Sequence, residues 1–204
     1  TMKIFRVVLA LAFVFVAFSA TGASAGAFTY TSGFQVQNLE ASQASIGITF
    51  YNQDGSVEAD VTDTVDANGS KTYFPLTDVA DGFNGSVVIA SSTQVAAIGN
   101  VLGDGGAAAA SYSASASGST TLSIPLLMQD NSGFNTWFNV QNTGSSAATV
   151  SVAYSDGTSA SATIQPGAAQ TFDQASTESH PQAVFAATVT SDQPVAATVI
   201  EERN

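Results

Sequence analysis

Residues 138–157 read FNVQNTGSSAATVSVAYSDG, and this stretch decides the fold class. Val150, Val152 and Tyr154 alternate with small or polar residues, which is the period of a β-strand with one buried face. A small-residue turn precedes this strand, and an Asp-Gly turn at 156–157 follows it. No sustained helical stripe of apolar residues appears after the N-terminal segment, so we expect an all-β protein.

The same pattern occurs once before in the chain. Residues 34–55 read FQVQNLEASQASIGITFYNQDG, so that Phe34 returns 104 residues later as Phe138. Further matches keep the same order: Gly69 followed by Phe74 returns as Gly167 followed by Phe172, and Val95-Ala96-Ala97 returns as Val195-Ala196-Ala197. Ordered matches with small changes in spacing are expected of a duplicated domain whose loops have drifted in length.

The chain of 204 residues has room for two small antiparallel β-sandwiches. We place the first sandwich at 26–102 and the second at 122–204. Between them, residues 103–121 are rich in Gly, Ala and Ser, which predicts a flexible linker. Alternation at Ser111-Tyr112-Ser113 leaves a partly paired edge strand as the alternative for this segment.

Residues 1–25 have the organisation of a secretory signal peptide. Lys3 and Arg6 precede an apolar run at 7–18, and an Ala-Ser-Ala cleavage pattern follows at 23–25. The apolar run is shorter than the roughly 20 residues that cross a bilayer as a helix. We therefore expect a secreted chain that loses this segment, and no membrane insertion of the mature protein.

The net charge and the absence of cysteine limit which partners the protein is expected to bind and which organisms it is expected to come from. Four basic residues face 16 acidic ones, for a formal net charge of −12, which disfavours binding to nucleic acid or to anionic membranes. The sequence has no cysteine, so it offers no disulfide framework and no thiol nucleophile. A secreted protein without disulfides points to a bacterium.

The second copy also resembles repeats of secreted surface proteins from filamentous bacteria. The stretches that carry the resemblance are IPLLMQDNSGFNTWFNVQNTGSSAATVSVAYSDG at 124–157, IQPGAAQTF at 164–172 and VTSDQPVAATV at 189–199. In those repeats the strands and turns belong to immunoglobulin-like β-sandwiches. The resemblance therefore implies two tandem immunoglobulin-like antiparallel β-sandwich domains and an extracellular or cell-surface location, and it identifies no ligand.

An asymmetry between the copies suggests a route to self-assembly. The second copy opens with the apolar stretch LSIPLLM at 122–128, whereas the first has only Phe28, Thr29, Tyr30 and Thr31 before its first matched strand. A sandwich short of one strand leaves an unpaired edge that a neighbouring subunit can complete. The alternative is that these four residues are simply a short first strand.

Few residues suggest catalysis or metal binding. The only histidine, His180, lies beside a proline in a polar stretch and is interpreted as a surface loop residue; with no further histidine or cysteine we expect no enzyme and no resident cofactor. Asp60, Asp63 and Asp66 are candidate calcium ligands, because carboxylates on a loop suit that ion. The alternative is a solvated acidic edge that deters strand pairing.

Three further residues are candidate surface sites. Asn68 and Asn84 lie in N-G-S triplets that match a glycosylation sequon, although Asn-Gly is equally a hairpin turn signal. Trp137 points to the opposite face of its strand from Phe138 and Val140, so it is the candidate for an exposed ring that stacks on a sugar.

These observations predict a structural subunit of an extracellular bacterial assembly, such as a filament, sheath or surface layer. The expected partner is a further copy of the chain, which gives a homo-oligomer or polymer joined through strand edges. The alternative is an adhesion or glycan-binding β-sandwich module, whose partner would be a cell-surface glycan.

Overall fold

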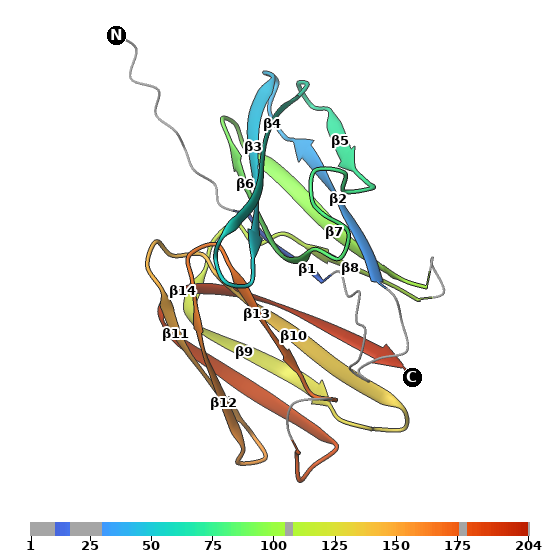
Figure 1. Ribbon diagram of the computed structural model, residues 1–204, viewed down its shortest axis with the longest axis vertical. Coiled ribbons are helices and arrows are strands. Elements are labelled where there is room, and N and C mark those ends of the chain that lie inside the picture. Colours follow the sequence, from blue (N-terminus) through green and yellow to red (C-terminus); the bar gives the residue numbers. More distant parts are fainter. Residues whose placement is uncertain (1–10, 17–29, 105–107, 176–178, 204) are drawn as a thin grey trace.

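The structure is a computed structural model that describes residues 11–16, 30–104, 108–175 and 179–203 (Figure 1). The protein is all-β: its described residues form antiparallel sheets connected by turns and loops. No helix capable of crossing a membrane occurs in these ranges. Two assemblies of strands, which we call the N-terminal half (β1 to β8) and the C-terminal half (β9 to β14), lie one above the other in Figure 1.

Two four-stranded sheets face each other in the N-terminal half. The first has the order β1 (Leu11–Val16), β6 (Asn84–Ser91), β3 (Ala44–Asn52) and β4 (Val57–Val65). The second has the order β5 (Ser70–Tyr73), β2 (Tyr30–Asn38), β7 (Val95–Gly103) and β8 (Ala108–Ser113). Phe34 and Val36 from the second sheet meet Ile46, Ile48 and Phe50 from the first in one buried cluster. The alternation in β3 therefore fills the core, as the sequence predicts.

The C-terminal half has one continuous sheet that contains an exceptionally long strand. Its order is β12 (Ser159–Ile164), β11 (Ala148–Tyr154), β14 (Val184–Arg203), β10 (Phe134–Asn142) and β13 (Ala169–Asp173), with β9 (Ser119–Met128) also paired to β14. The first part of β14 pairs with β11 and β9, and its last part pairs with β10. The single strand β14 thus contributes residues to both sides of the second core.

Strands at matching places in the two halves pair in matching registers. Ile46 lies opposite Ser91, and Val150 lies opposite Ser191. Likewise Val36 lies opposite Ala97, and Val140 lies opposite Ala197. β6 and β7 in the N-terminal half therefore occupy the places that the two parts of β14 occupy in the C-terminal half.

β2 and β10 each end in a buried asparagine, and the two asparagines make corresponding hydrogen bonds. The Asn142 side chain donates to the carbonyl oxygens of Ser146 (2.7 Å) and Ile164 (2.9 Å) and accepts from the Gly144 N–H (2.8 Å). Asn38 makes the corresponding bonds to Ser42, Val65 and Glu40. Both side chains are fully buried. The asparagine of the V-Q-N motif thus connects the end of its strand to two neighbouring segments by hydrogen bonds.

The fold corrects two expectations. The 103–121 segment, expected to be a flexible linker, contains β8, which pairs with β7 from Ile98 opposite Ser113 to Gly103 opposite Ala108. The alternative of an edge strand at Ser111-Tyr112-Ser113 therefore describes this part of the segment. The expected match between Phe74 and Phe172 is also wrong. Tyr73 takes that place, since its ring stacks on Phe34 as Phe172 stacks on Phe138.

Candidate assembly edge

The outer edge of β6 is the candidate functional site, because among the described residues the strand that covers it comes from the chain's N-terminal segment. On its inner side β6 pairs with β3 from Ser91 to Gly85. On its outer side, residues 84–89 pair with the backbone of residues 11–16 in β1 (Figure 1). β1 belongs to the segment for which the sequence predicts an export signal, and this stays a prediction. Removal of that segment would leave the outer backbone groups of β6 open.

The β6 edge borders directly on the first core. Val87 and Ile89 are fully buried, and Ser86, whose hydroxyl donates to the Gly167 carbonyl oxygen of the C-terminal half, is buried as well. The backbone is tightly enclosed at Gly85, where an added Cβ would lie 2.0 Å from the Tyr51 carbonyl oxygen. Losing the strand that covers this edge would therefore expose apolar core as well as unpaired peptide groups, which is costly in water.

The opposite edge of the same sheet is chemically different. β4 carries Glu58 and Asp60 exposed and Asp63 half-buried, whereas β6 reads NGSVVIAS and has no charged residue. Charges on an edge strand repel an incoming strand, and their absence permits pairing. β6 is thus the edge of this sheet that is suited to accepting a further strand.

Of the four expected joining residues, the structure describes two. Phe28 and Thr29 fall outside the described residues. Tyr30 and Thr31 are the first two residues of β2 and pair with Gly103 and Leu102 of β7. The stretch is therefore not a separate first strand of the N-terminal half within the residues described, and Tyr30 and Thr31 are part of the fold.

Trp137 lies at the junction between the halves, so the expectation of an exposed ring is wrong. Only 5% of the residue is exposed, and it packs with Ala169 and Ile200 against Ala110 and Tyr112 of β8. The outward face of β10 is covered by the N-terminal half, a tertiary contact that strand periodicity alone cannot indicate.

A shared carboxylate reinforces this junction. The indole N–H of Trp137 lies 3.4 Å from a carboxylate oxygen of Glu202, and the hydroxyl of Tyr30 donates to the same oxygen. Burial raises the pKa of Tyr30 above its ordinary value, and the Glu202 carboxylate raises it further. The tyrosine therefore stays protonated and able to donate at any physiological pH.

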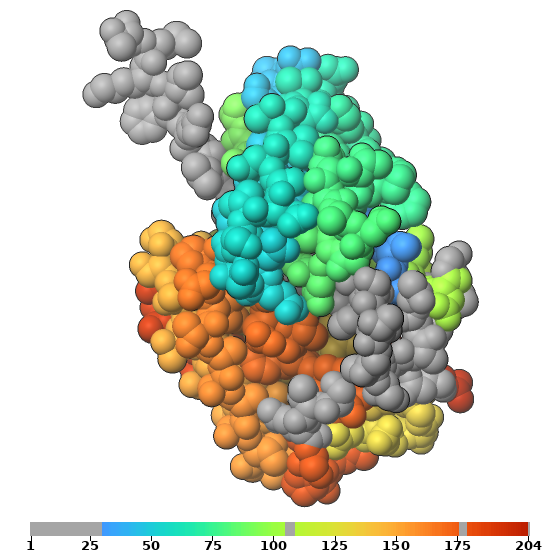
Figure 2. Space-filling view, viewed as in Figure 1, coloured from blue at the N-terminus to red at the C-terminus, as the bar shows by residue number. Residues whose placement is uncertain are grey.

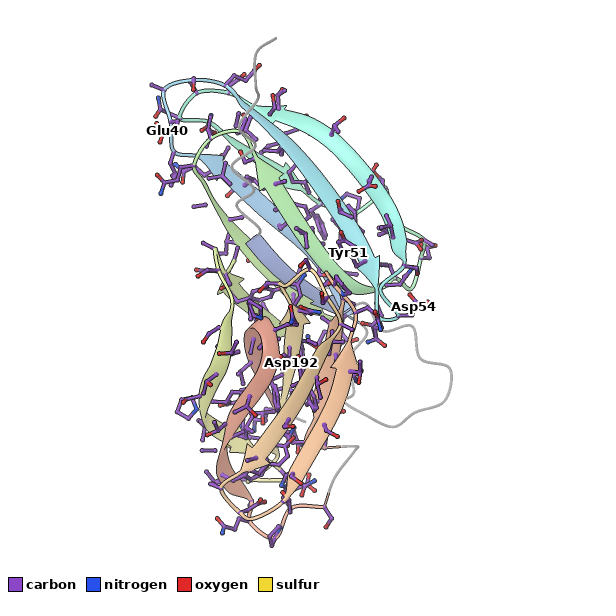
Figure 3. All side chains as sticks on the ribbon, turned by 90° about the vertical axis from the view of Figure 1, so that its left-hand side faces the viewer. Glu40, Tyr51, Asp54 and Asp192 are labelled. Atoms are coloured by element: carbon purple, nitrogen blue, oxygen red, sulfur yellow. The ribbon has the colours of Figure 1, made fainter. Side chains whose placement is uncertain are left out.

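A second set of contacts lies at the β3–β4 hairpin. The Ser86 hydroxyl donates to the Gly167 carbonyl oxygen (2.5 Å), and the Tyr51 ring lies against Gly167. Figure 3 places Tyr51 and Asp54 beside the C-terminal half, whereas Glu40 lies at the far end of the N-terminal half. In Figure 2 the hairpin residues touch the C-terminal half directly. Two separate contacts therefore join the halves.

The three candidate calcium ligands do not converge. Asp60 accepts a hydrogen bond from Thr49 (2.6 Å), Asp63 is paired with Lys71 (2.6 Å), and Asp66 accepts from Gln43 (3.0 Å). In the part of the chain that the structure describes, no group of three or more acidic or histidine side chains could hold a metal ion. Residues three apart on a strand point to opposite faces, which separates Asp60 from Asp63.

The Asp63–Lys71 pair leads to a prediction about pH. Lys71 lowers the pKa of Asp63 below its ordinary value of 3.8, so the pair stabilises the fold above that value and loses its effect as the pH falls through the folded-state pKa. We expect Asp63→Asn to cost about 0.5 kcal/mol at pH 7 and less at pH 2. Urea unfolding of both chains at the two pH values measures this, and an equal cost at both would contradict it.

The two sequon asparagines differ in position. Asn68 is exposed in the turn between β4 and β5, with a left-handed φ of 57°, whereas Asn84 is the first residue of β6, opposite Val16 of β1. Asn68 is thus the left-handed residue of a turn that the Gly69 N–H closes on the Asp66 carbonyl oxygen (2.9 Å), and its side chain is accessible. Glycosylation of either residue stays a prediction.

His180 is buried, so its interpretation as a surface loop residue is wrong. Its side chain is 0% exposed, and Nδ1 lies 2.7 Å from Asp156 Oδ2. The ring stacks on Phe185, with centroids 4.0 Å apart, and meets Tyr154 edge-on. The contact between His180 and Asp156 could not be predicted from the sequence, because the two residues come from different loops.

The groups around His180 are not arranged as in a catalytic relay. The Thr158 hydroxyl lies 3.1 Å from Nδ1, the same ring nitrogen that contacts Asp156. In a Ser-His-Asp relay the hydroxyl and the carboxylate sit on opposite ring nitrogens. Burial acts to raise the pKa of Asp156, but hydrogen bonds from Thr158 and the contact with His180 outweigh it, so the pKa lies below its ordinary value. The cluster holds the β11–β12 hairpin to the loop before β14.

Comparisons with known proteins do not assign the chain to a family. No family model and no curated protein matches the sequence. Among solved structures, the Anabaena sensory rhodopsin transducer is 18% identical, with a TM-score of 0.33, over 47% of this chain and 95% of its own. Thermotoga maritima 1070 is 17% identical, also at 0.33, over 51% and 90%. The Cowpea mosaic virus top component is 10% identical at 0.24, over 90% and 85%. Likenesses at these TM-scores carry no functional argument.

Proposed function

We propose that the chain is a secreted structural subunit of an extracellular bacterial assembly, built of two tandem immunoglobulin-like β-sandwiches. In this proposal the N-terminal segment is an export signal, and a further copy of the chain supplies the strand that covers β6 after the signal is removed. The single observation that carries the proposal is the β6 edge, which is uncharged, borders the core and, in the described part of the chain, pairs on its outer side with residues 11–16.

The arrangement of the halves supports a role in bearing load. The junction buries Trp137 and Ile200 and adds hydrogen bonds at Glu202 and Gly167. Contacts at two places resist bending of one half against the other. Such a rigid subunit suits a filament or layer, in which each copy passes force to the next.

The glycan-binding alternative loses its main support. It depended on an exposed aromatic platform at Trp137, and that ring packs between the halves instead. We likewise propose no enzymatic activity, because the His180 geometry does not place a hydroxyl as nucleophilic catalysis requires.

The mass of the processed chain in solution tests the proposal. We expect the chain from Gly26 to form filaments or large ordered oligomers, detected by light scattering and electron microscopy of the same sample. A stable monomer at all concentrations would contradict self-assembly as a property of the chain.

A further inference from the structure

The position of β1 in the N-terminal half is the position of β9 in the C-terminal half. Leu11 and Phe13 of β1 lie opposite Ile89 and Val87 of β6. The equivalent residues of β14, Val189 and Ala187, lie opposite Leu122 and Ile124 of β9. Because Ile89 matches Val189 in its pairing to β3 and β11, the two covering strands share one register as well as one place.

β9 shows what a strand at this place contributes. Ile124 is 3% exposed, Leu127 is 0% exposed and Met128 is 6% exposed, and Ile124 and Leu127 belong to the second core cluster. A strand here therefore closes the sandwich, in addition to pairing with the edge. The C-terminal half has this strand within its own sequence, directly before β10.

We propose that residues 11–16 are a removable substitute for that strand, so that a chain retaining them is closed and a processed chain has an open acceptor edge on β6. This inference rests on the proposed function, in which the N-terminal segment is cut off. The acceptor takes an extended segment whose apolar residues alternate and lie opposite Ile89 and Val87. The natural occupant in the precursor is the chain's own segment, and its successor is a strand from a second copy.

The chemistry of β6 favours such an exchange. None of its six paired residues is charged, so none needs to stay in water. None is a proline, so every residue keeps the backbone N–H that strand pairing uses. The pairing of β1 with β6 has no register shift, whereas β9 carries Pro125 beside a register irregularity between Phe185 and Ala187. The strand that must stay in place is thus irregular, and the exchangeable one is regular.

A synthetic peptide tests the acceptor. The probe is the sequence ALAFVFVA of residues 10–17 with two lysines at each end for solubility, and the control has the same composition in shuffled order. We expect the probe to bind the chain from Gly26 at one peptide per chain and to raise its Tm by about 5 °C at saturation. The shuffled peptide is expected to leave the Tm unchanged.

Three chains that begin at Met2, produced without export, complete the test. The chain from Met2 is expected not to bind the probe, because β1 occupies the edge. Ala12→Pro, in the middle of β1, is expected to restore binding, whereas Thr21→Pro, outside the strand, is expected not to. These chains remain informative if the chain from Gly26 fails to fold.

The outcomes separate this inference from the proposed function. Binding of the probe by a Gly26 chain that stays monomeric would support the acceptor and contradict self-assembly. A chain that assembles but does not bind the probe even when dilute and unassembled would support a structural role and overturn the acceptor. Equal binding of the probe to the chain from Met2 and to the chain from Gly26 would also overturn it.

Discussion

Asn142→Ala is expected to lower the free energy of unfolding by about 3 kcal/mol. Asn142 is fully buried and makes three hydrogen bonds that connect the end of β10 with the following turn and with the end of β12. Alanine removes all three and leaves the Ser146 and Ile164 carbonyl oxygens without this donor. Equilibrium unfolding in urea, followed by circular dichroism, measures the loss.

Two variants control the Asn142 measurement. Asn38→Ala removes the corresponding bonds in the N-terminal half and is expected to cost a similar amount. Asn52→Ala removes bonds to Ser56 and Glu58 on the exposed hairpin and is expected to cost less than about 0.5 kcal/mol. Equal effects of Asn142→Ala and Asn52→Ala would show that the buried asparagine is not a structural tie.

Trp137→Ala is expected to lower the free energy of unfolding by about 3 to 5 kcal/mol, as for other buried aromatic residues. The ring fills the space between β10 and β8, so its removal leaves a cavity at the junction and frees Glu202 from one donor. Urea unfolding measures the loss. The native chain has a single tryptophan, so its fluorescence reports the junction directly.

Trp137→Phe is the matched control, since it keeps most of the ring volume and loses the N–H that faces Glu202. We expect it to cost less than half as much as the alanine variant. Should Trp137→Ala unfold at the same urea concentration as the native chain, the ring would have to lie in solvent, and the glycan-binding alternative would regain its candidate platform.

Local sequence patterns were sufficient for the fold class and for many strands. The alternation of Ile46, Ile48 and Phe50 predicts β3 and its buried face, because strand periodicity is a local property. The Asp-Gly turns were also readable: Gly55 and Gly157 both adopt positive φ, of 89° and 93°, which glycine tolerates at no steric cost. These features depend on neighbours in the sequence.

The features that sequence reasoning missed depend on distant contacts. The burial of Trp137 and His180 requires knowing which loop or strand lies above them, and their partners are Ala110 and Asp156 in other parts of the chain. Residues 11–16 are harder still, because an apolar run suits export and a buried strand equally. The pairing of these residues with β6 becomes visible only in the structure.

Hydrogen exchange at β6 tests the central claim most directly. The chain from Gly26 is compared as an assembled sample and as a dilute one, with peptides that cover residues 84–89 followed by mass spectrometry. The account predicts that exchange in this segment is slow in the assembly and fast in the dilute chain, while exchange in β10 stays slow in both. Fast exchange at β6 in the assembled sample would show that copies associate elsewhere and would contradict the claim.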